Sequence, residues 1–157
     1  MDKNILYKLP KDLLVELVCK NFDNVSCEQM LEIYQKKAEN ELIKKKEFLS
    51  KKHLVPNTDI FIELDSRIFI FQRESGSLDI EVLLPRGMQN CIFINIDGRT
   101  IGCENENDMA ACLSKILLEN LDEHIVNNIM SLLLSLIRLY NERKQIKKIL
   151  NMISTDR

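Results

Sequence analysis

Tryptophan is absent from this 157-residue chain, and glycine and proline are scarce, with four and three residues. The glycines stand alone at predicted turns or in predicted strands (Gly76, Gly87, Gly98 and Gly102). No Gly-rich loop suited to phosphates is therefore present. No G-x-S-x-G motif occurs either, so the nucleophile elbow of the α/β-hydrolases is excluded.

An excess of charge of one sign and long apolar runs are lacking as well. The formal net charge is −2, so no overall field favours nucleic acid or an anionic membrane. The most apolar run begins at Ile129, is interrupted by Arg138 and is too short to span a bilayer. The length suffices for one core. We therefore expect a single domain over 1–157, with no membrane or nucleic-acid partner.

The five cysteines are odd in number, form no C-x-x-C pair and follow no signal peptide. This usage predicts a reducing, intracellular and cytoplasmic setting in which the thiols act as small hydrophobes. His53 and His124 have no ligand-type neighbours at a metal-binding spacing, and Cys91 and Cys103 are predicted on opposite faces of one hairpin. The sequence therefore predicts no metal, no cofactor and no catalytic residues.

Residues 9–52 are predicted to form an N-terminal helix pair. Pro10 suits a first helical turn, and apolar residues follow it at helical spacing (Leu13, Leu14, Leu17 and Val18). Ser26 and Gln29 have the spacing of a capping box, which starts a second helix reaching about Lys52. One side of this second helix carries a row of apolar residues (Met30, Tyr34, Ala38, Leu42 and Leu49).

Residues 59–103 change to a period of two, which predicts a five-stranded antiparallel meander. Two-residue turns are expected at Asp65-Ser66, Ser75-Gly76 and Asp97-Gly98, the last being the strongest signal. These turns pair Ile62 with Phe69, Ile60 with Phe71, Phe71 with Ile80, Phe69 with Val82, Ile94 with Ile101, and Ile92 with Cys103. One face is then apolar throughout, and the second face carries five further apolar residues (Phe61, Ile68, Ile70, Leu83 and Phe93).

Residues 105–153 return to helical periodicity. Asn105 or Asn107 is expected to cap a helix that runs to about Asn120, and a second helix begins at Asp122. The second helix has two apolar stripes, so it needs two packing partners. The whole order predicts an α+β fold with this C-terminal helix pair packed on one sheet face. A homodimer through the second stripe is expected to use four residues (Leu133, Leu136, Ile137 and Tyr140).

A basic run lies on the helix expected before Lys52 (Lys36, Lys37, Lys44, Lys45, Lys46, Lys51 and Lys52). Three glutamates interleave with it and no arginine accompanies it, so a solvated charged face is the favoured interpretation. Further basic residues stand near the C-terminus (Arg138, Arg143, Lys144, Lys147 and Lys148). They add to the run if the two segments meet in space.

The stretch LPKDLLVELV, residues 9–18, resembles the start of an F-box, whose first helix begins with Leu-Pro, an acidic residue and paired leucines. The resemblance covers about a dozen residues and implies an adaptor that bridges a substrate to a ubiquitin-ligase scaffold. It also implies a partner-binding set (Leu9, Pro10, Leu13, Leu14 and Leu17).

The same opening is similar to that of uncharacterised proteins of large eukaryotic DNA viruses, in which it leads into a long Lys/Glu-rich helix. That resemblance implies a host cytoplasm or a virion as the location and no particular activity. The leading hypothesis from the residues is a non-enzymatic protein-interaction or assembly component that acts through its helices. The alternatives are the F-box-like adaptor and an enzyme with a cryptic cysteine site.

Overall fold

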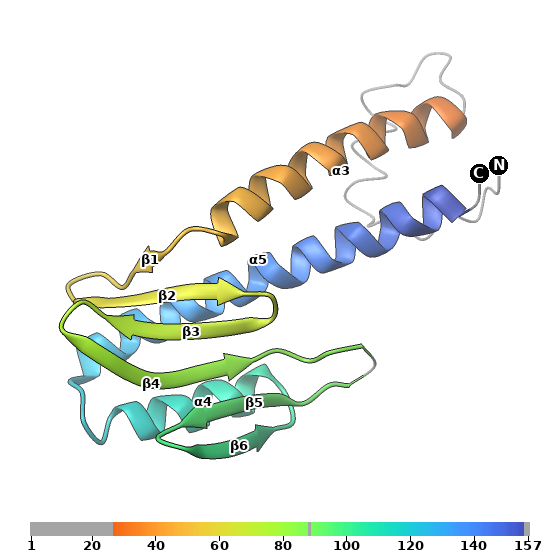
Figure 1. Ribbon diagram of the computed structural model, residues 1–157. Helices are drawn as coiled ribbons and strands as arrows, with labels where there is room; N and C mark the ends of the chain where they lie inside the picture. Colours follow the sequence, from red (N-terminus) through yellow and green to blue (C-terminus); the bar gives the residue numbers. More distant parts are fainter. Residues whose placement is uncertain (1–26, 88, 156–157) are drawn as a thin grey trace. The chain divides into compact units, whose positions relative to one another are not determined.

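The computed structural model describes residues 27–87 and 89–155 (Figure 1). The chain divides into two compact units, Met1–Glu47 with Leu139–Arg157 and Phe48–Arg138, where we expected a single domain. The reason lies in the last helix, α5 (Glu123–Thr155). Its 33 residues span about 50 Å at 1.5 Å per residue, so it contributes to both units. The N-terminal helix expected from Pro10 lies outside the described residues.

The larger unit contains an antiparallel sheet whose strands follow one another in sequence order. The strands are β1 (His53–Leu54), β2 (Ile60–Asp65), β3 (Ile68–Arg73), β4 (Gly76–Leu83), β5 (Ile92–Ile96) and β6 (Arg99–Cys103). The predicted α+β class is confirmed, but the described sheet has six strands and not five. Strand β1 was missed because its two residues are too few to show a period of two.

The first hairpin has a different register from the predicted one. Ile62 pairs with Phe71 and not with Phe69, because the turn lies at Ser66-Arg67, one residue later than expected. Ser66 has a φ of 59°, and the Arg67 side chain donates a hydrogen bond to the Leu84 carbonyl at 2.9 Å. The slip moves each partner by two residues. Since side chains alternate with a period of two, the predicted apolar face is unchanged.

The second hairpin keeps its predicted core pairs, Phe71 with Ile80 and Phe69 with Val82. Its turn, however, lies at Glu74-Ser75, because β4 is irregular opposite the junction of Phe71 and Gln72. A bulge of this kind absorbs extra residues while the far part of the ladder stays in register. The third hairpin is as predicted, with Ile94 opposite Ile101 and positive φ at both Asp97 and Gly98.

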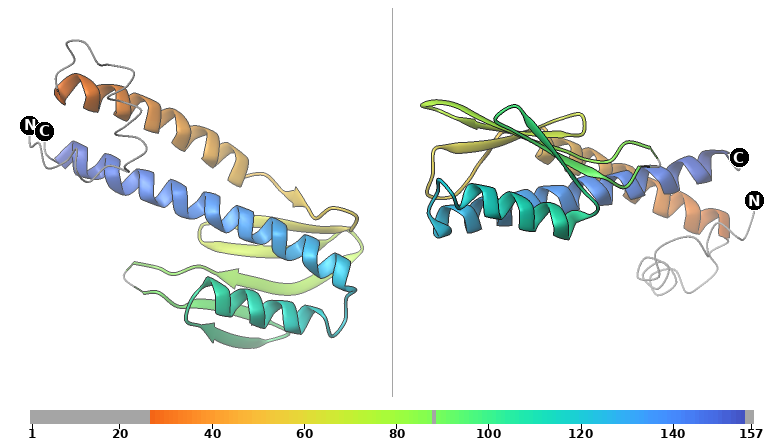
Figure 2. Two further views of the ribbon diagram at one scale, coloured as in Figure 1. Left: turned by 180° about the vertical axis from the view of Figure 1, so that it is seen from behind. Right: turned by 90° about the horizontal axis from the view of Figure 1, so that it is seen from below.

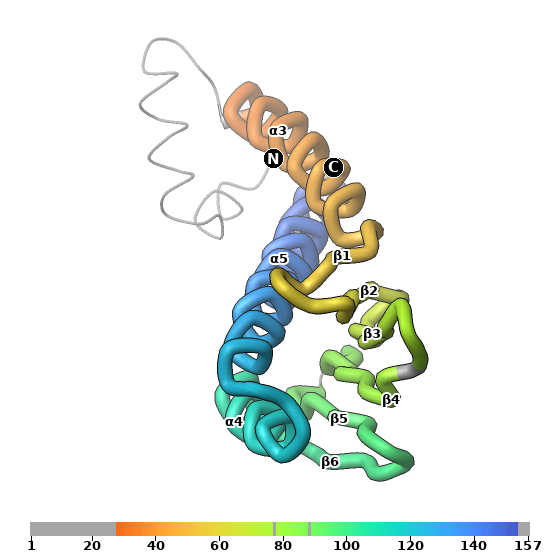
Figure 3. Tube along the Cα trace, turned by 90° about the vertical axis from the view of Figure 1, so that its left-hand side faces the viewer, coloured from red at the N-terminus to blue at the C-terminus, as the bar shows by residue number. Residues whose placement is uncertain are grey.

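Two helices cover one face of this sheet (Figures 2 and 3). They are α4 (Glu106–Leu117) and α5 up to Arg138. The Asn105 side chain accepts a hydrogen bond at 2.8 Å from the Asp108 N–H, so the predicted N-cap is confirmed. The sheet face that the helices cover is buried at every central position (Ile60, Ile62, Phe69, Phe71, Ile80, Val82, Ile92, Ile94 and Ile96).

The smaller unit pairs α3 (Cys27–Leu49) with the last part of α5. The two helices are antiparallel, and five side chains form their core (Leu31, Tyr34, Ala38, Ile149 and Ile153). Leu31 was not predicted, while the predicted Met30 and Leu42 are only partly buried. A helix presents a stripe about 100° wide, so one position can replace a neighbour three or four residues away.

Candidate binding surfaces

Arg73, at the end of β3, lines two hollows in the larger unit. One has a volume of about 680 Å³ and the other about 290 Å³. The Arg73 Nε is buried and has no hydrogen-bond partner. Carboxylates line both hollows (Asp59 and Glu74 in the larger, Asp79, Asp97 and Glu119 in the smaller). They offset the charge of the guanidinium, so this site does not favour an anionic ligand.

The sheet face turned away from α4 and α5 carries the five apolar residues predicted for it, and each is partly exposed. We call it the open sheet face (Phe61, Ile68, Ile70, Leu83 and Phe93). Of the described elements of this unit, none lies over it (Figure 3). Ile68 is opposite Leu83, which is opposite Phe93, and Ile70 is two residues from Ile68 on the same strand. These four residues form one continuous apolar strip across β3, β4 and β5.

Two flanking features limit the apolar strip. Phe93 lies over Gly102, with a ring carbon 3.5 Å from where a Cβ would stand, so the strip ends at β6. Phe61 lies on β2, at the opposite side of the open sheet face from Phe93. The Lys52 Nζ is 5.3 Å from the centre of the Phe61 ring. This contact is a cation–π interaction that partly screens Phe61 from water.

Three carboxylates lie beside the apolar strip, two on β2 and one on β4. Ile70 is paired with Glu63 on one side and with Glu81 on the other, and Asp65 is paired with Ile68. None of these three carboxylates forms an ion pair with a cation of the described residues. The open sheet face therefore combines an apolar strip with carboxylates on β2 and β4.

The smaller unit brings cations from two helices together. Lys45 Nζ lies 3.3 Å from Glu142 Oε2, so α3 and α5 lie side by side at these two residues. Lys46 follows Lys45, Arg143 follows Glu142, and Lys147 lies one turn further along α5. Basic residues of α3 and basic residues near the C-terminus therefore lie close together within this unit. This proximity was the condition for the two segments to form one basic patch.

The three cations of this group interact with one another. The Arg143 guanidinium lowers the pKa of Lys147 below its ordinary value, and burial and the Lys46 ammonium lower it further. The Arg143 Nε is buried without a hydrogen-bond partner. We call Lys46, Arg143 and Lys147 the cationic cluster.

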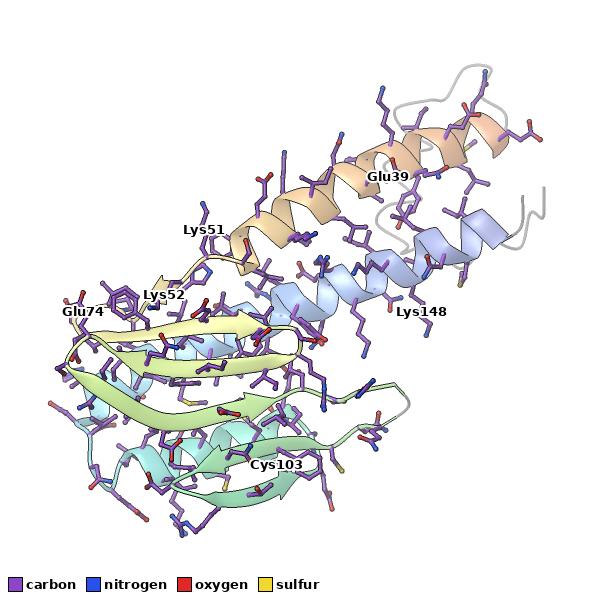
Figure 4. The ribbon with its side chains drawn as sticks, in the orientation of Figure 1. Glu39, Lys51, Lys52, Glu74, Cys103 and Lys148 are labelled. Atoms are coloured by element: carbon purple, nitrogen blue, oxygen red, sulfur yellow. The ribbon has the colours of Figure 1, made fainter. Side chains whose placement is uncertain are left out.

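The three described cysteines of the larger unit are free thiols. Cys91 is exposed, Cys112 is partly exposed and Cys103 is buried at the end of β6 (Figure 4). Burial first, and then the neighbouring Cys112 and Asp108, raise the pKa of the Cys103 thiol. A raised pKa disfavours the thiolate, which is the nucleophilic form, so the environment of Cys103 does not activate it.

The structure places the predicted interface residues as follows. The F-box-like set (Leu9, Pro10, Leu13, Leu14 and Leu17) lies outside the described residues. Leu133, Leu136 and Ile137 are buried within a single chain, with at most 2% of each side chain exposed, and Tyr140 is partly buried. These residues therefore offer little surface to a second copy. The stripe is part of the chain's own core, and dimerisation through it stays a prediction.

Two further observations concern the described residues 27–87 and 89–155. No group of three or more histidine, cysteine, aspartate or glutamate side chains there is arranged to hold a metal ion. None of the helices described has both the length and the apolar character to cross a membrane. Comparison of the chain with protein-family models, with curated proteins and with solved structures gives no match in any of the three.

Proposed function

We propose that this chain is a non-enzymatic protein-interaction component, and that its open sheet face binds a basic amphipathic segment of a partner protein. The observation that supports this proposal is the apolar strip with three carboxylates beside it and no described element of the larger unit over it. Apolar patches with a polar rim are typical of interaction sites. The face is part of a hydrogen-bonded sheet, so binding would cost little backbone ordering.

The charges around the strip favour a basic partner over a second copy of the chain. In an isologous dimer through this face, Glu63 and Glu81 of one chain would approach the same carboxylates of the other. Like charges at an interface oppose association. Lys or Arg residues beside an apolar stripe on the partner would instead pair with Glu63 and Glu81. A helix with an apolar face and basic flanks has this chemistry.

A pair of synthetic peptides tests the proposal. One is an amphipathic helix of leucine and lysine, and the other has glutamate in place of each lysine. We expect the lysine peptide alone to bind, as measured by fluorescence anisotropy at low salt. The substitution Glu81→Lys should weaken its binding by about tenfold, which corresponds to roughly 1.4 kcal/mol.

Glu104→Lys is the matched control, because it makes the same change of charge at an exposed position after β6. It should leave binding of the lysine peptide unchanged. Equal weakening by both substitutions would mean that only the net charge matters and would contradict the proposal. A chain that sediments as a dimer, and as a monomer after Glu81→Lys, would assign the face to a second copy instead.

A further inference from the structure

We propose that the cationic cluster on α3 and α5 is a binding site for a phosphate group. Lys46 comes from α3, and Arg143 and Lys147 come from α5. The site belongs to the smaller unit and does not depend on the open sheet face. Nothing in its argument requires the proposed function to hold.

The arrangement of these side chains differs from that of an ordinary solvated lysine face. On such a face, the charges of a helix are usually balanced by opposite charges three or four residues away. Here Arg143 and Lys147 are four residues apart and have the same sign, and Lys46 of the other helix adds a third positive charge. Like charges at this spacing destabilise a helix. A local arrangement that costs stability is expected where it serves binding.

Arg143, burial and Lys46 lower the pKa of Lys147, and no carboxylate is among these causes. Glu142 is paired with Lys45. Among the described residues, none of the three cations forms an ion pair with a carboxylate. An anion from solution would therefore relieve a repulsion that the fold leaves in place.

The chemistry of the three groups suits phosphate. A guanidinium donates hydrogen bonds in a fixed planar fork, and ammonium groups add compact charges that can approach from other directions. Arg143 has a buried Nε that no protein acceptor satisfies. Charge-assisted hydrogen bonds from such donors to phosphate oxygens are stronger than neutral ones. No aromatic side chain belongs to the cluster, so base stacking is not part of the recognition.

The first experiment titrates the full chain with inorganic pyrophosphate at low ionic strength, because salt screens exposed charges. We expect saturable binding by calorimetry, and we expect Lys147→Gln to weaken it by about tenfold, one decade of the dissociation constant. Lys46→Gln should act in the same direction.

Lys148→Gln is the matched control. Lys148 carries the same charge on the next residue of α5 and extends from the side of the helix away from α3 (Figure 4). It should leave pyrophosphate binding unchanged. Equal weakening by Lys147→Gln and Lys148→Gln would overturn the proposal, because it would mean that diffuse charge and not a site binds the anion. Absence of saturable binding to pyrophosphate, to a duplex and to vesicles would overturn it as well.

A second readout separates a binding role from a structural one. Lys147→Gln removes a charge that both Arg143 and Lys46 repel, so it should raise the melting temperature while it weakens binding. Lys148→Gln removes a charge that has only Lys144 at this spacing on α5, so it should raise the melting temperature less and leave binding unchanged. In the wild-type chain, bound pyrophosphate should raise the pKa of Lys147, followed by NMR of its side-chain carbon, because an anion favours the charged form. A pKa that does not change when pyrophosphate binds would place the anion elsewhere and overturn the assignment.

The source of the phosphate is decided by two further probes, a short DNA duplex and vesicles of phosphatidylcholine with phosphatidylserine. Binding of pyrophosphate alone assigns a small phosphorylated ligand. If the chain binds the duplex, and Lys147→Gln weakens this binding while Lys148→Gln does not, the phosphate belongs to a nucleic-acid backbone. If vesicle binding responds to the two substitutions in the same way, the phosphate belongs to a lipid headgroup. Each of these three results supports the phosphate site.

Discussion

Arg73 and Arg143 show how one kind of residue acquires different roles from its surroundings. Each has a buried Nε without a hydrogen-bond partner, which normally carries a cost in stability. Carboxylates line the hollows beside Arg73, and they compensate its charge. Arg143 instead has Lys46 and Lys147 beside it, and the three charges repel one another. The anion site that we propose is therefore at Arg143 and not at Arg73.

Cys103 permits a prediction at the same scale. Its pKa is raised above the ordinary value of 9.0 in the folded protein, mainly by burial. We therefore expect iodoacetamide at neutral pH to alkylate Cys91 first and Cys103 most slowly of the three described cysteines of the larger unit, as followed by mass spectrometry of digested samples. Alkylation of Cys103 faster than that of free cysteine would favour the enzyme hypothesis instead.

The raised pKa of Cys103 also makes the free energy of unfolding depend on pH. A thiol with a raised pKa in the folded state ionises first in the unfolded state. Its contribution to the free energy of unfolding is complete below pH 9.0 and is lost as the pH rises through the higher folded value. Cys103→Ala, which cannot ionise, should therefore lose less stability than the wild-type chain above pH 9.0.

At the scale of elements, the turns decide the strand registers. The Asp97-Gly98 turn has positive φ at both residues, and this backbone joins β5 and β6 in the predicted register. The turn at Ser66-Arg67 contains no glycine, and the tertiary hydrogen bond from Arg67 to the Leu84 carbonyl helps hold it. A turn that depends on a distant acceptor cannot be located from its own residues.

Two glycine substitutions test this role of the backbone. A Cβ added at Gly98 or at Gly76 meets no atom within 4 Å, so neither substitution creates a clash. Gly98 has a φ of +78°, whereas Gly76 has no such restriction. We expect Gly98→Ala to lower the free energy of unfolding by about 1–2 kcal/mol. Gly76→Ala should raise it by roughly 0.4–1 kcal/mol, because alanine reduces the entropy of the unfolded chain.

Chemical denaturation of the two variants measures the difference. The slope against denaturant concentration should stay the same, so that a shift of the midpoint reports stability alone. If both variants lost the same stability, the cause would be a general intolerance of these turns to a side chain. The left-handed backbone at Gly98 would then not explain the register of the third hairpin.

At the scale of the whole molecule, the apolar core is divided unequally. Five of the 27 buried apolar side chains among the described residues belong to the smaller unit, and the remainder belong to the larger one. Local stability follows the amount of buried apolar contact. The smaller unit also carries the repulsion of the cationic cluster.

Amide hydrogen exchange should therefore differ between the units. We expect the amides of β3, β4 and the first half of α5 to exchange slowest and those of α3 to exchange fastest among the regular elements. Pyrophosphate should slow exchange in α3 if it binds Lys46, because a ligand of the native state adds to stability. Equal protection of α3 and β3 in the free chain would contradict the unequal core.

The sequence by itself determined the features that depend on neighbouring residues. Alternation identified the buried sheet face even where the first hairpin slipped, because a shift of two residues preserves the side of each side chain. Asn105 and Asp97-Gly98 were predicted correctly, since a cap and a tight turn are formed by adjacent backbone and side-chain groups.

Only the tertiary structure decided the features that join distant parts of the chain. The pairing of α3 with the last part of α5 brings together residues about a hundred positions apart, and periodicity shows that a helix has an apolar face but not which partner covers it. This pairing buries Ile149 and Ile153, and it also places Lys46 beside Arg143 and Lys147. Like charges from different segments come together when apolar packing between those segments outweighs their repulsion, and no local pattern records that balance.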